Sequence, residues 1–212
     1  RKNLARVIPN RFMDEVRKVS PWPNIVSMSR LGAVPILIVI FVCWGNEQIF
    51  PEPWFWWMVL GIFSIGMATD ALDGYLARKL DSVTIFGRMM DPLIDKILIQ
   101  SVLILLSVST WTSTLVPYWA VILIICRETL ITGLRGYAEV QQIDFSASKL
   151  GKGKTMSQTI AIIMILAGMA IHGVSMQEML YSEICYWAMM IATTLTVISG
   201  VDYAIKLRSA MS

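Results

Sequence analysis

The sequence predicts an all-α integral membrane protein with six transmembrane helices, and three observations support that prediction. Apolar residues make up 56% of the 212 residues and charged residues only 16%, and the mean hydropathy is +0.62. Soluble domains are usually about 45–50% apolar and about 25% charged. Six apolar stretches each reach the roughly 20 residues that a helix needs to cross a bilayer. We place them near residues 24–45, 53–77, 85–108, 115–137, 155–174 and 184–206.

The segment before the first stretch, residues 1–20, is expected to lie along the membrane surface. Its apolar residues recur at three- and four-residue steps among several Arg and Lys residues, which is typical of an interfacial amphipathic helix on an anionic leaflet. Pro9 interrupts the pattern, so we allow for a helix that starts after Asn10. A mobile basic tail is the alternative. Residues 21–212 then form one domain of six helices.

Charge placement predicts the orientation of the six stretches. The loops at 46–53, 109–116 and 172–183 contain no Lys or Arg. The N-terminal region, the loops at 78–88 and 135–154 and the C-terminus hold nearly all of these residues, and the exceptions are Arg30, Lys96 and Arg127. By the positive-inside rule, both termini and the loop between the second and third stretches are expected on the cytoplasmic side.

Four aspartates lie where the second and third stretches reach that side. One stripe with helical spacing ends the second stretch and comprises Asp70, Asp73, Gly74, Ala77 and Arg78. A second stripe opens the third stretch and comprises Gly87, Asp91 and Asp95. Because a short loop joins the two stretches, we expect antiparallel neighbouring helices whose stripes face each other.

The free-energy cost of placing carboxylates in a membrane indicates that these four need a counter-charge. An Asp at the centre of a spanning helix costs roughly 2.5–3.5 kcal/mol, and four unpaired carboxylates would also repel one another. A divalent cation would neutralise them, and oxygen ligands suit Mg²⁺, Mn²⁺ or Ca²⁺. The glycines and the alanine of the stripes leave room for a headgroup. The alternative is that the aspartates cap helix ends and pair with Arg78, Arg88 and Lys96.

The two stripes also carry a family resemblance. At all eight fixed positions, Asp70-x2-Asp73-Gly74-x2-Ala77-Arg78-x8-Gly87-x3-Asp91-x3-Asp95 resembles the signature of the CDP-alcohol phosphotransferases, intramembrane enzymes of phospholipid synthesis. PNIVSMSR, at 23–30, resembles the entry to that family's first spanning helix. CRETLITGLRGYAE and SKLGKGKTMSQ resemble the branch that makes phosphatidylglycerophosphate. The resemblance reaches the first five stretches and implies the fold of this family.

The resemblance implies roles for individual residues. It implies two Mg²⁺ or Mn²⁺ ions held by Asp70, Asp73, Asp91 and Asp95, with Asp95 also acting as the catalytic base. It places the CDP-diacylglycerol among Pro23, Asn24, Gly74, Ala77, Arg78, Thr84 and Gly87. Judged without the resemblance, Thr84 is a loop hydroxyl and Asn24 a candidate helix N-cap. The family also implies a homodimer in the membrane and no nucleic-acid partner.

A group of cations in the fourth and fifth stretches suggests a second anion site. Arg127 and Glu128 lie inside the fourth stretch, where charges are functional or paired with each other. We expect the acceptor phosphate to be bound by Arg127, Arg135, Lys152 and Lys154. Positive-inside charge on a solvated loop is the alternative, and it explains Lys149 better than Arg127.

The expected reaction transfers the phosphatidyl group of CDP-diacylglycerol to sn-glycerol 3-phosphate, giving phosphatidylglycerophosphate and CMP. Phosphatidylglycerol and inositol phosphate remain alternative acceptors, whereas a phosphate-binding cluster argues against a bare alcohol such as serine. A cation transporter is a remote alternative, because transporter carboxylates tend to lie near the membrane midplane in inverted repeats. Here the carboxylates lie at one edge, and no repeat is visible.

Overall fold

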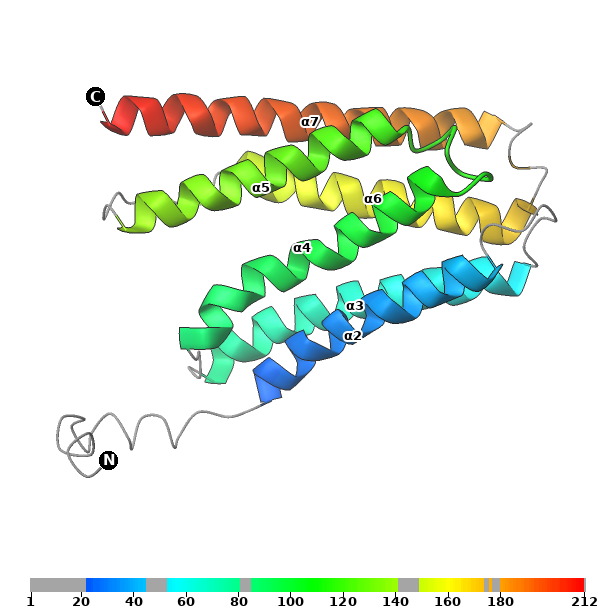
Figure 1. Cartoon of the computed structure of the whole chain (residues 1–212), viewed down its shortest axis with the longest axis horizontal. Coiled ribbons are helices and arrows are strands. Elements are labelled where there is room, and N and C mark those ends of the chain that lie inside the picture. The colour runs from blue at the N-terminus through cyan, green and yellow to red at the C-terminus, as the bar shows by residue number, and fades with distance from the viewer. Residues whose placement is uncertain are drawn as a thin grey trace.

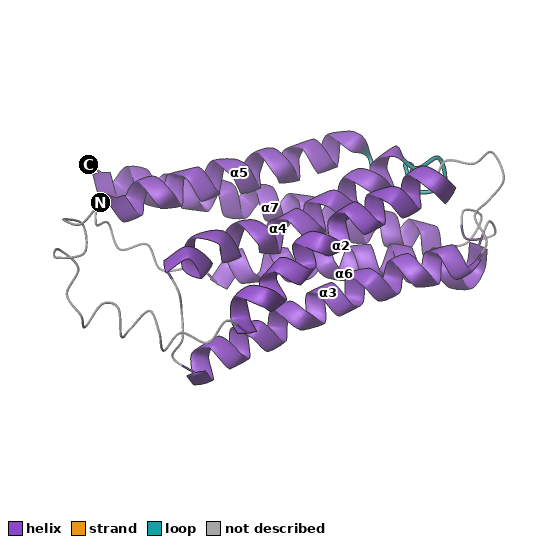
Figure 2. Cartoon of the chain, turned by 60° about the horizontal axis from the view of Figure 1, so that its bottom comes forward, coloured by secondary structure: helices purple, strands orange, loops and turns teal. Residues whose placement is uncertain are grey.

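The computed structural model of the chain is a bundle of six α-helices, and the residues it describes contain no strand (Figures 1 and 2). The helices are α2 (Trp22–Trp44), α3 (Pro53–Leu80), α4 (Ile85–Val108), α5 (Tyr118–Val140), α6 (Lys149–His172) and α7 (Leu180–Met211). The backbone is described at 22–44, 53–80, 85–140, 149–173, 176 and 180–211. Side chains are described within 32–43, 53–69, 96–134, 153–173 and 180–206, and at positions 136 and 176. The predicted all-α class is confirmed, and the described residues form six helices close to the six predicted stretches.

The helix limits differ most from the prediction at the start of α6. We expected that helix to begin near residue 155, but it begins at Lys149, so Lys152 and Lys154 lie on the helix rather than in the loop before it. The prediction was wrong because it followed the apolar residues. A helix can continue beyond its apolar part, since its backbone N–H and C=O groups pair within it whatever the side chains.

Successive helices run in opposite directions (Figure 1). The ends of α3, α5 and α7 therefore lie at the same end of the bundle as the starts of α2, α4 and α6. Helix α4 contacts α3 on one side and α5 on another, while α6 packs against α3 and α7. This arrangement brings the two aspartate-bearing helices next to the helices that carry the predicted acceptor cations.

The interior of the bundle is apolar, and every helix contributes to it. Fully buried side chains, one from each helix in order, are Leu37, Phe63, Leu103, Ile124, Ile165 and Met189. Phe55 packs edge to face against Phe41 and Trp56, with ring centroids 5.3 Å and 4.9 Å apart, and so joins α2 to α3. This packing holds the helices in place far from the polar end of the bundle.

The outer surface of the bundle is also apolar. Large apolar side chains are exposed on all six helices, among them Val42, Ile65, Val108, Leu130, Ile171 and Ile191. Two helical segments, Gly153–His172 and Leu180–Lys206, are long and apolar enough to cross a membrane. The segments Gly32–Cys43, Pro53–Thr69 and Lys96–Val108 are apolar but shorter. Six spanning helices therefore stay a prediction, and the amphipathic segment at 1–20 lies outside the described residues.

Candidate functional site

The four motif aspartates lie on two helices that contact each other. Asp70 and Asp73 belong to the last turns of α3, and Asp91 and Asp95 to the first turns of α4, at the same end of the bundle (Figure 1). The helical spacing that we predicted for both stripes is thus present in the backbone. The aspartate side chains lie outside the described ones.

The donor set suits a hard divalent ion. Four carboxylates from two adjoining helices supply only oxygen ligands, the type that Mg²⁺ and Mn²⁺ prefer. Among the side chains that the structure does describe, no group of three or more His, Cys, Asp or Glu could hold a metal. The four aspartates of α3 and α4 are outside that set, and their carboxylate oxygens are the ligands that such an ion prefers.

The other predicted donor-binding residues are distributed over three helices. Gly74, Ala77 and Arg78 lie on α3, and Gly87 lies on α4. The structure describes the backbone at these four positions but not the side chains. Pro23 and Asn24 lie in the first turn of α2, which begins at Trp22. Asn24 is therefore inside the helix rather than at its N-cap. Thr84 falls between α3 and α4, outside the described residues.

A buried carboxylate on α5 gathers three cations from three helices. Lys154 of α6 and Arg127 of α5 both bind Oε1 of Glu128, and Arg127 Nη1 donates to it over 3.0 Å. Lys96 of α4 places its Nζ 3.4 Å from Oε2 of Glu128. The side chains of Glu128 and Lys154 are each only 7% exposed, against 31% for Lys96. We call Glu128, Lys96, Arg127 and Lys154 the Glu128 cluster.

Hydrogen bonds hold the cluster in place. Lys96 Nζ donates to Thr132 Oγ1, which in turn donates to the backbone oxygen of Glu128 over 2.7 Å. Arg127 Nη2 donates to Ser199 Oγ of α7 over 2.9 Å. Cations from α4, α5 and α6 thus meet at one carboxylate, and α7 joins the cluster through Arg127. Taking charges out of water costs several kcal/mol per ion, and such pairing is what makes their burial tolerable.

The cluster has a positive excess. Three cations share one carboxylate, so these four side chains together carry a formal net charge of +2. A phosphate monoester carries nearly two negative charges at neutral pH, and Arg and Lys bind phosphate oxygens by charge-assisted hydrogen bonds. The cluster is therefore matched in charge to a phosphate dianion.

Two of the four predicted acceptor residues have described side chains, and the structure brings these two together. Arg127 and Lys154 meet at Glu128, whereas Arg135 and Lys152 lie on α5 and α6 with side chains outside the described ones. Lys96 was missed, because we had considered it only as a partner for the aspartates. The signal that could have revealed it is a Lys and a Glu, both inside apolar stretches, each in need of an opposite charge.

A cavity of about 310 Å³ lies against the Glu128 cluster, between α4 and α5. Its lining residues are Lys96, Ile97, Gln100, Glu128, Thr129, Thr132 and Gly133. The lining combines an ammonium, a carboxylate, an amide and two hydroxyl groups, which suits a small polar molecule with several hydrogen-bonding groups. Asp95 immediately precedes Lys96, so this cavity begins beside the turn of α4 that carries the last motif aspartate.

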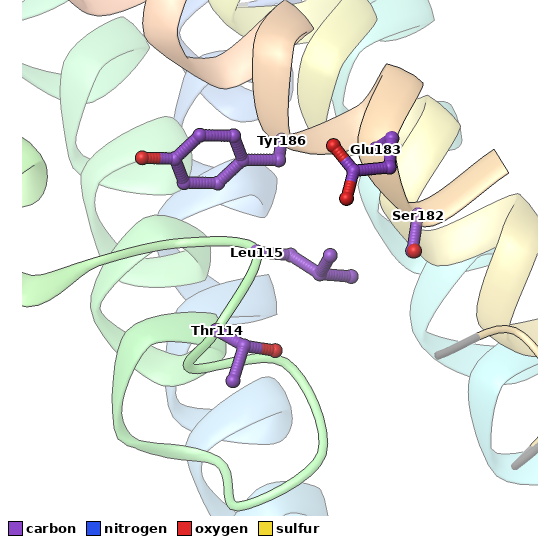
Figure 3. A pocket seen from close by; sticks show the side chains of 5 residues that line it. All are labelled: Thr114, Leu115, Ser182, Glu183 and Tyr186. Carbon is purple, nitrogen blue, oxygen red and sulfur yellow. The ribbon is translucent and has the colours of Figure 1, made fainter. Parts of the chain in front are cut away.

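A second cavity, of about 430 Å³, lies where the α4–α5 connection meets the start of α7 (Figure 3). Thr114 and Leu115 of the α4–α5 connection and Ser182, Glu183 and Tyr186 of α7 line it. Its lining includes a carboxylate but no Lys or Arg, so it does not suit a phosphate. The two cavities therefore differ in the charge of the ligand that they could take.

Comparison with known proteins identifies the class to which this bundle belongs. Residues 21–198 match the family model of the CDP-alcohol phosphatidyltransferases, and the chain belongs to that family. It is 36% identical over 195 residues to a CDP-diacylglycerol–glycerol-3-phosphate 3-phosphatidyltransferase of Bacillus subtilis, covering 87% of this chain and 93% of that protein.

Two further relatives show how far the similarity extends. A protein of the same name from Rickettsia bellii is 32% identical over 183 residues, covering 85% of this chain and 92% of that protein. A cardiolipin synthase (CMP-forming) from rice, Oryza sativa subsp. japonica, is 33% identical over 160 residues, covering 71% of this chain and 46% of that protein.

Proposed function

We propose that this protein transfers the phosphatidyl group of CDP-diacylglycerol to sn-glycerol 3-phosphate, forming phosphatidylglycerophosphate and releasing CMP. The observation that supports the choice of acceptor is the Glu128 cluster, whose formal net charge of +2 is opposite to that of a phosphate monoester. Family membership and the names of the Bacillus subtilis and Rickettsia bellii relatives support the same reaction.

The donor would bind at the motif on α3 and α4. Asp70, Asp73, Asp91 and Asp95 would hold two Mg²⁺ or Mn²⁺ ions, and when bound these ions would neutralise charge on the diphosphate. The small residues of both stripes would leave room for the CDP group. Arg78, Pro23, Asn24 and Thr84 would contact it, as the family resemblance implies.

The chemistry then needs one proton transfer and one displacement at phosphorus. Asp95 would accept the proton of the acceptor hydroxyl, and that oxygen would form a bond to the lipid-bearing phosphorus. The bond from this phosphorus to the oxygen of the CMP phosphate would break, and CMP would leave with the electron pair. Because Lys96 follows Asp95 in α4, a phosphate held by Lys96 keeps the acceptor beside the base. Positioning of this kind is a major source of rate enhancement.

The membrane arrangement is part of the proposal. All six helices would span the bilayer, with both termini and the active site on the cytoplasmic face and residues 1–20 lying along its surface. The exposed apolar side chains on every helix and the clustering of Lys and Arg at alternate loops support this orientation. The enzyme would act as a homodimer, as the resemblance implies.

Phosphatidylglycerol is a second candidate acceptor, because the rice relative is named for forming cardiolipin whereas the Bacillus subtilis relative is named for acting on glycerol 3-phosphate. Phosphatidylglycerol is a phosphodiester and carries one negative charge. A cluster with a formal net charge of +2 favours a dianion, so glycerol 3-phosphate fits better. Inositol phosphate has the same charge and stays a competitor. A cation transporter has no support, because the chain belongs to a family of transferases.

A CMP-release assay with each acceptor in turn tests this proposal. We expect the purified protein, in liposomes that contain CDP-diacylglycerol, to release CMP with glycerol 3-phosphate and to be slow with phosphatidylglycerol, inositol phosphate and serine. Faster release with another acceptor would overturn the assignment of glycerol 3-phosphate. Release with none of them would overturn the proposed reaction as a whole.

Removing one cation of the cluster should selectively weaken binding of the acceptor. Lys154→Met keeps an unbranched apolar chain and leaves Glu128 with Arg127 and Lys96 as partners. Losing one contact to a charged group costs roughly 1.5–3 kcal/mol, so KM for glycerol 3-phosphate should rise about 10–150-fold while KM for CDP-diacylglycerol changes little. Arg135→Ala should act in the same direction. Initial rates measured against each substrate separately give both constants.

The matched control for this prediction is Lys206→Met. Lys206 is an exposed lysine on α7 that pairs with Asp202 one turn earlier, at 2.7 Å. This variant should leave both KM values unchanged. If Lys154→Met and Arg135→Ala weaken binding of the donor alone, or of neither substrate, the acceptor phosphate binds elsewhere.

A further inference from the structure

We infer that Ser199 and Gly200 of α7 are positioning residues that fix Arg127 in the acceptor site. The inference rests on the proposed function, because it assigns Arg127 to the acceptor phosphate. Both residues lie just beyond residues 21–198, the part that matches the family model. Helix α7, about which the motifs say little, thereby gains a role in the reaction.

The Arg127 guanidinium is held from two helices. Its Nη1 donates to Glu128 Oε1 over 3.0 Å, and its Nη2 donates to Ser199 Oγ over 2.9 Å. A guanidinium is a rigid planar fork, so two bonds at different nitrogens set the direction of the whole group. The bond from α7 therefore adds a second point at which the orientation of this guanidinium is fixed.

Ser199 is itself fixed. Its hydroxyl donates to the backbone oxygen of Thr196 over 2.9 Å, so an oxygen lone pair is left to accept from Arg127. Gln158 of α6 donates to Thr196 Oγ1 over 2.8 Å and ties this turn of α7 to its neighbour. Ser199, Thr196 and Gln158 are all buried. The Ser199 oxygen that accepts the hydrogen bond from Arg127 therefore lies on a turn of α7 that is itself bonded to α6.

Gly200 supplies the space that the side chain of Arg127 needs. A Cβ placed on Gly200 would lie 2.9 Å from Cγ of Arg127, 3.3 Å from its Nε and 3.7 Å from its Cδ. The first of these distances is shorter than real Cβ contacts, so any larger residue would push the stem of Arg127 away from α7. A displaced stem cannot keep both guanidinium bonds at their present lengths.

The test compares Ser199→Ala and Gly200→Ala with two controls. Each variant should raise KM for glycerol 3-phosphate roughly tenfold, which corresponds to about 1.4 kcal/mol, with kcat and KM for CDP-diacylglycerol nearly unchanged. Gly61→Ala is the glycine control, because a Cβ there meets nothing within 4 Å. Thr194→Ala is the hydroxyl control, since Thr194 is exposed and bonds only its own helix at Met190, over 2.8 Å. Both controls should behave as the wild type.

A double-mutant cycle separates positioning from a general loss of structure. The single ammonium of Arg127→Lys cannot reproduce the two-nitrogen fork, so adding Ser199→Ala to it should change KM little further. Full additivity, an equal rise in KM for both substrates, or unchanged KM in Ser199→Ala would each overturn the inference. Should Gly200→Ala fail to fold, Ser199→Ala decides the matter. Wild-type protein that releases no CMP with glycerol 3-phosphate would instead refute the proposed function.

Discussion

Asp95→Asn should lower turnover about 10²–10⁴-fold, the factor that a general base typically contributes. Asparagine has nearly the same shape as aspartate but cannot accept the proton of the acceptor hydroxyl. Because Asp95 is proposed as the base, binding of CDP-diacylglycerol should survive better in Asp95→Asn than in Asp70→Asn, which loses a ligand for the ions. The measurements are the initial rate of CMP release and equilibrium binding of the donor in detergent.

Asp202→Asn is the control for that experiment. Asp202 lies on α7, pairs with the exposed Lys206 and has no part in the motif on α3 and α4. Its amide variant should turn over at the wild-type rate. A near wild-type rate in Asp95→Asn would mean that another group takes the proton.

Removing divalent metal should abolish CMP release altogether. Four carboxylates on contacting helices would repel one another and the diphosphate of the donor unless cations neutralise them. Activity should disappear with EDTA and return on adding excess Mg²⁺ or Mn²⁺. Metal dependence should shift in Asp70→Asn, which should need a higher Mg²⁺ concentration for half of its own maximal rate.

The control for the metal experiment is EDTA that has been saturated with Mg²⁺ before it is added. It should leave the rate unchanged, which excludes an effect of the chelator on the liposomes. Full activity of a preparation shown by elemental analysis to be free of divalent metal would rule out the proposed role of the four aspartates.

Features that depend on neighbours in sequence were predictable. Helix α4 has the predicted limits at both ends, since its apolar length and the turn before Ile85 are local signals. The two aspartate stripes follow from helical spacing alone, and the backbone of α3 and α4 has that spacing. The eight-position motif needed no knowledge of how the helices pack.

Features that depend on packing between helices were not predictable. Lys154 lies 26 positions from Glu128 and Ser199 lies 72 positions from Arg127, so no local pattern reports either contact. Gly200 appears in the sequence as one small residue among others, and its importance depends on Arg127 lying across it. Charges inside apolar stretches showed that partners must exist, but only the bundle shows which partners they are.

The sharing of Glu128 among helices has a consequence for biogenesis. An isolated helix with a Lys or Arg at its centre enters a bilayer at a cost of roughly 2.5–3.5 kcal/mol for that residue. Helix α5 brings its own counter-charge, because Arg127 and Glu128 are adjacent, whereas Lys96 and Lys154 each contact Glu128 from another helix. The contact between Lys96 of α4 and Glu128 would therefore form only after α5 is synthesised. The carboxylate at the centre of the proposed acceptor site would then also influence the order in which the helices assemble.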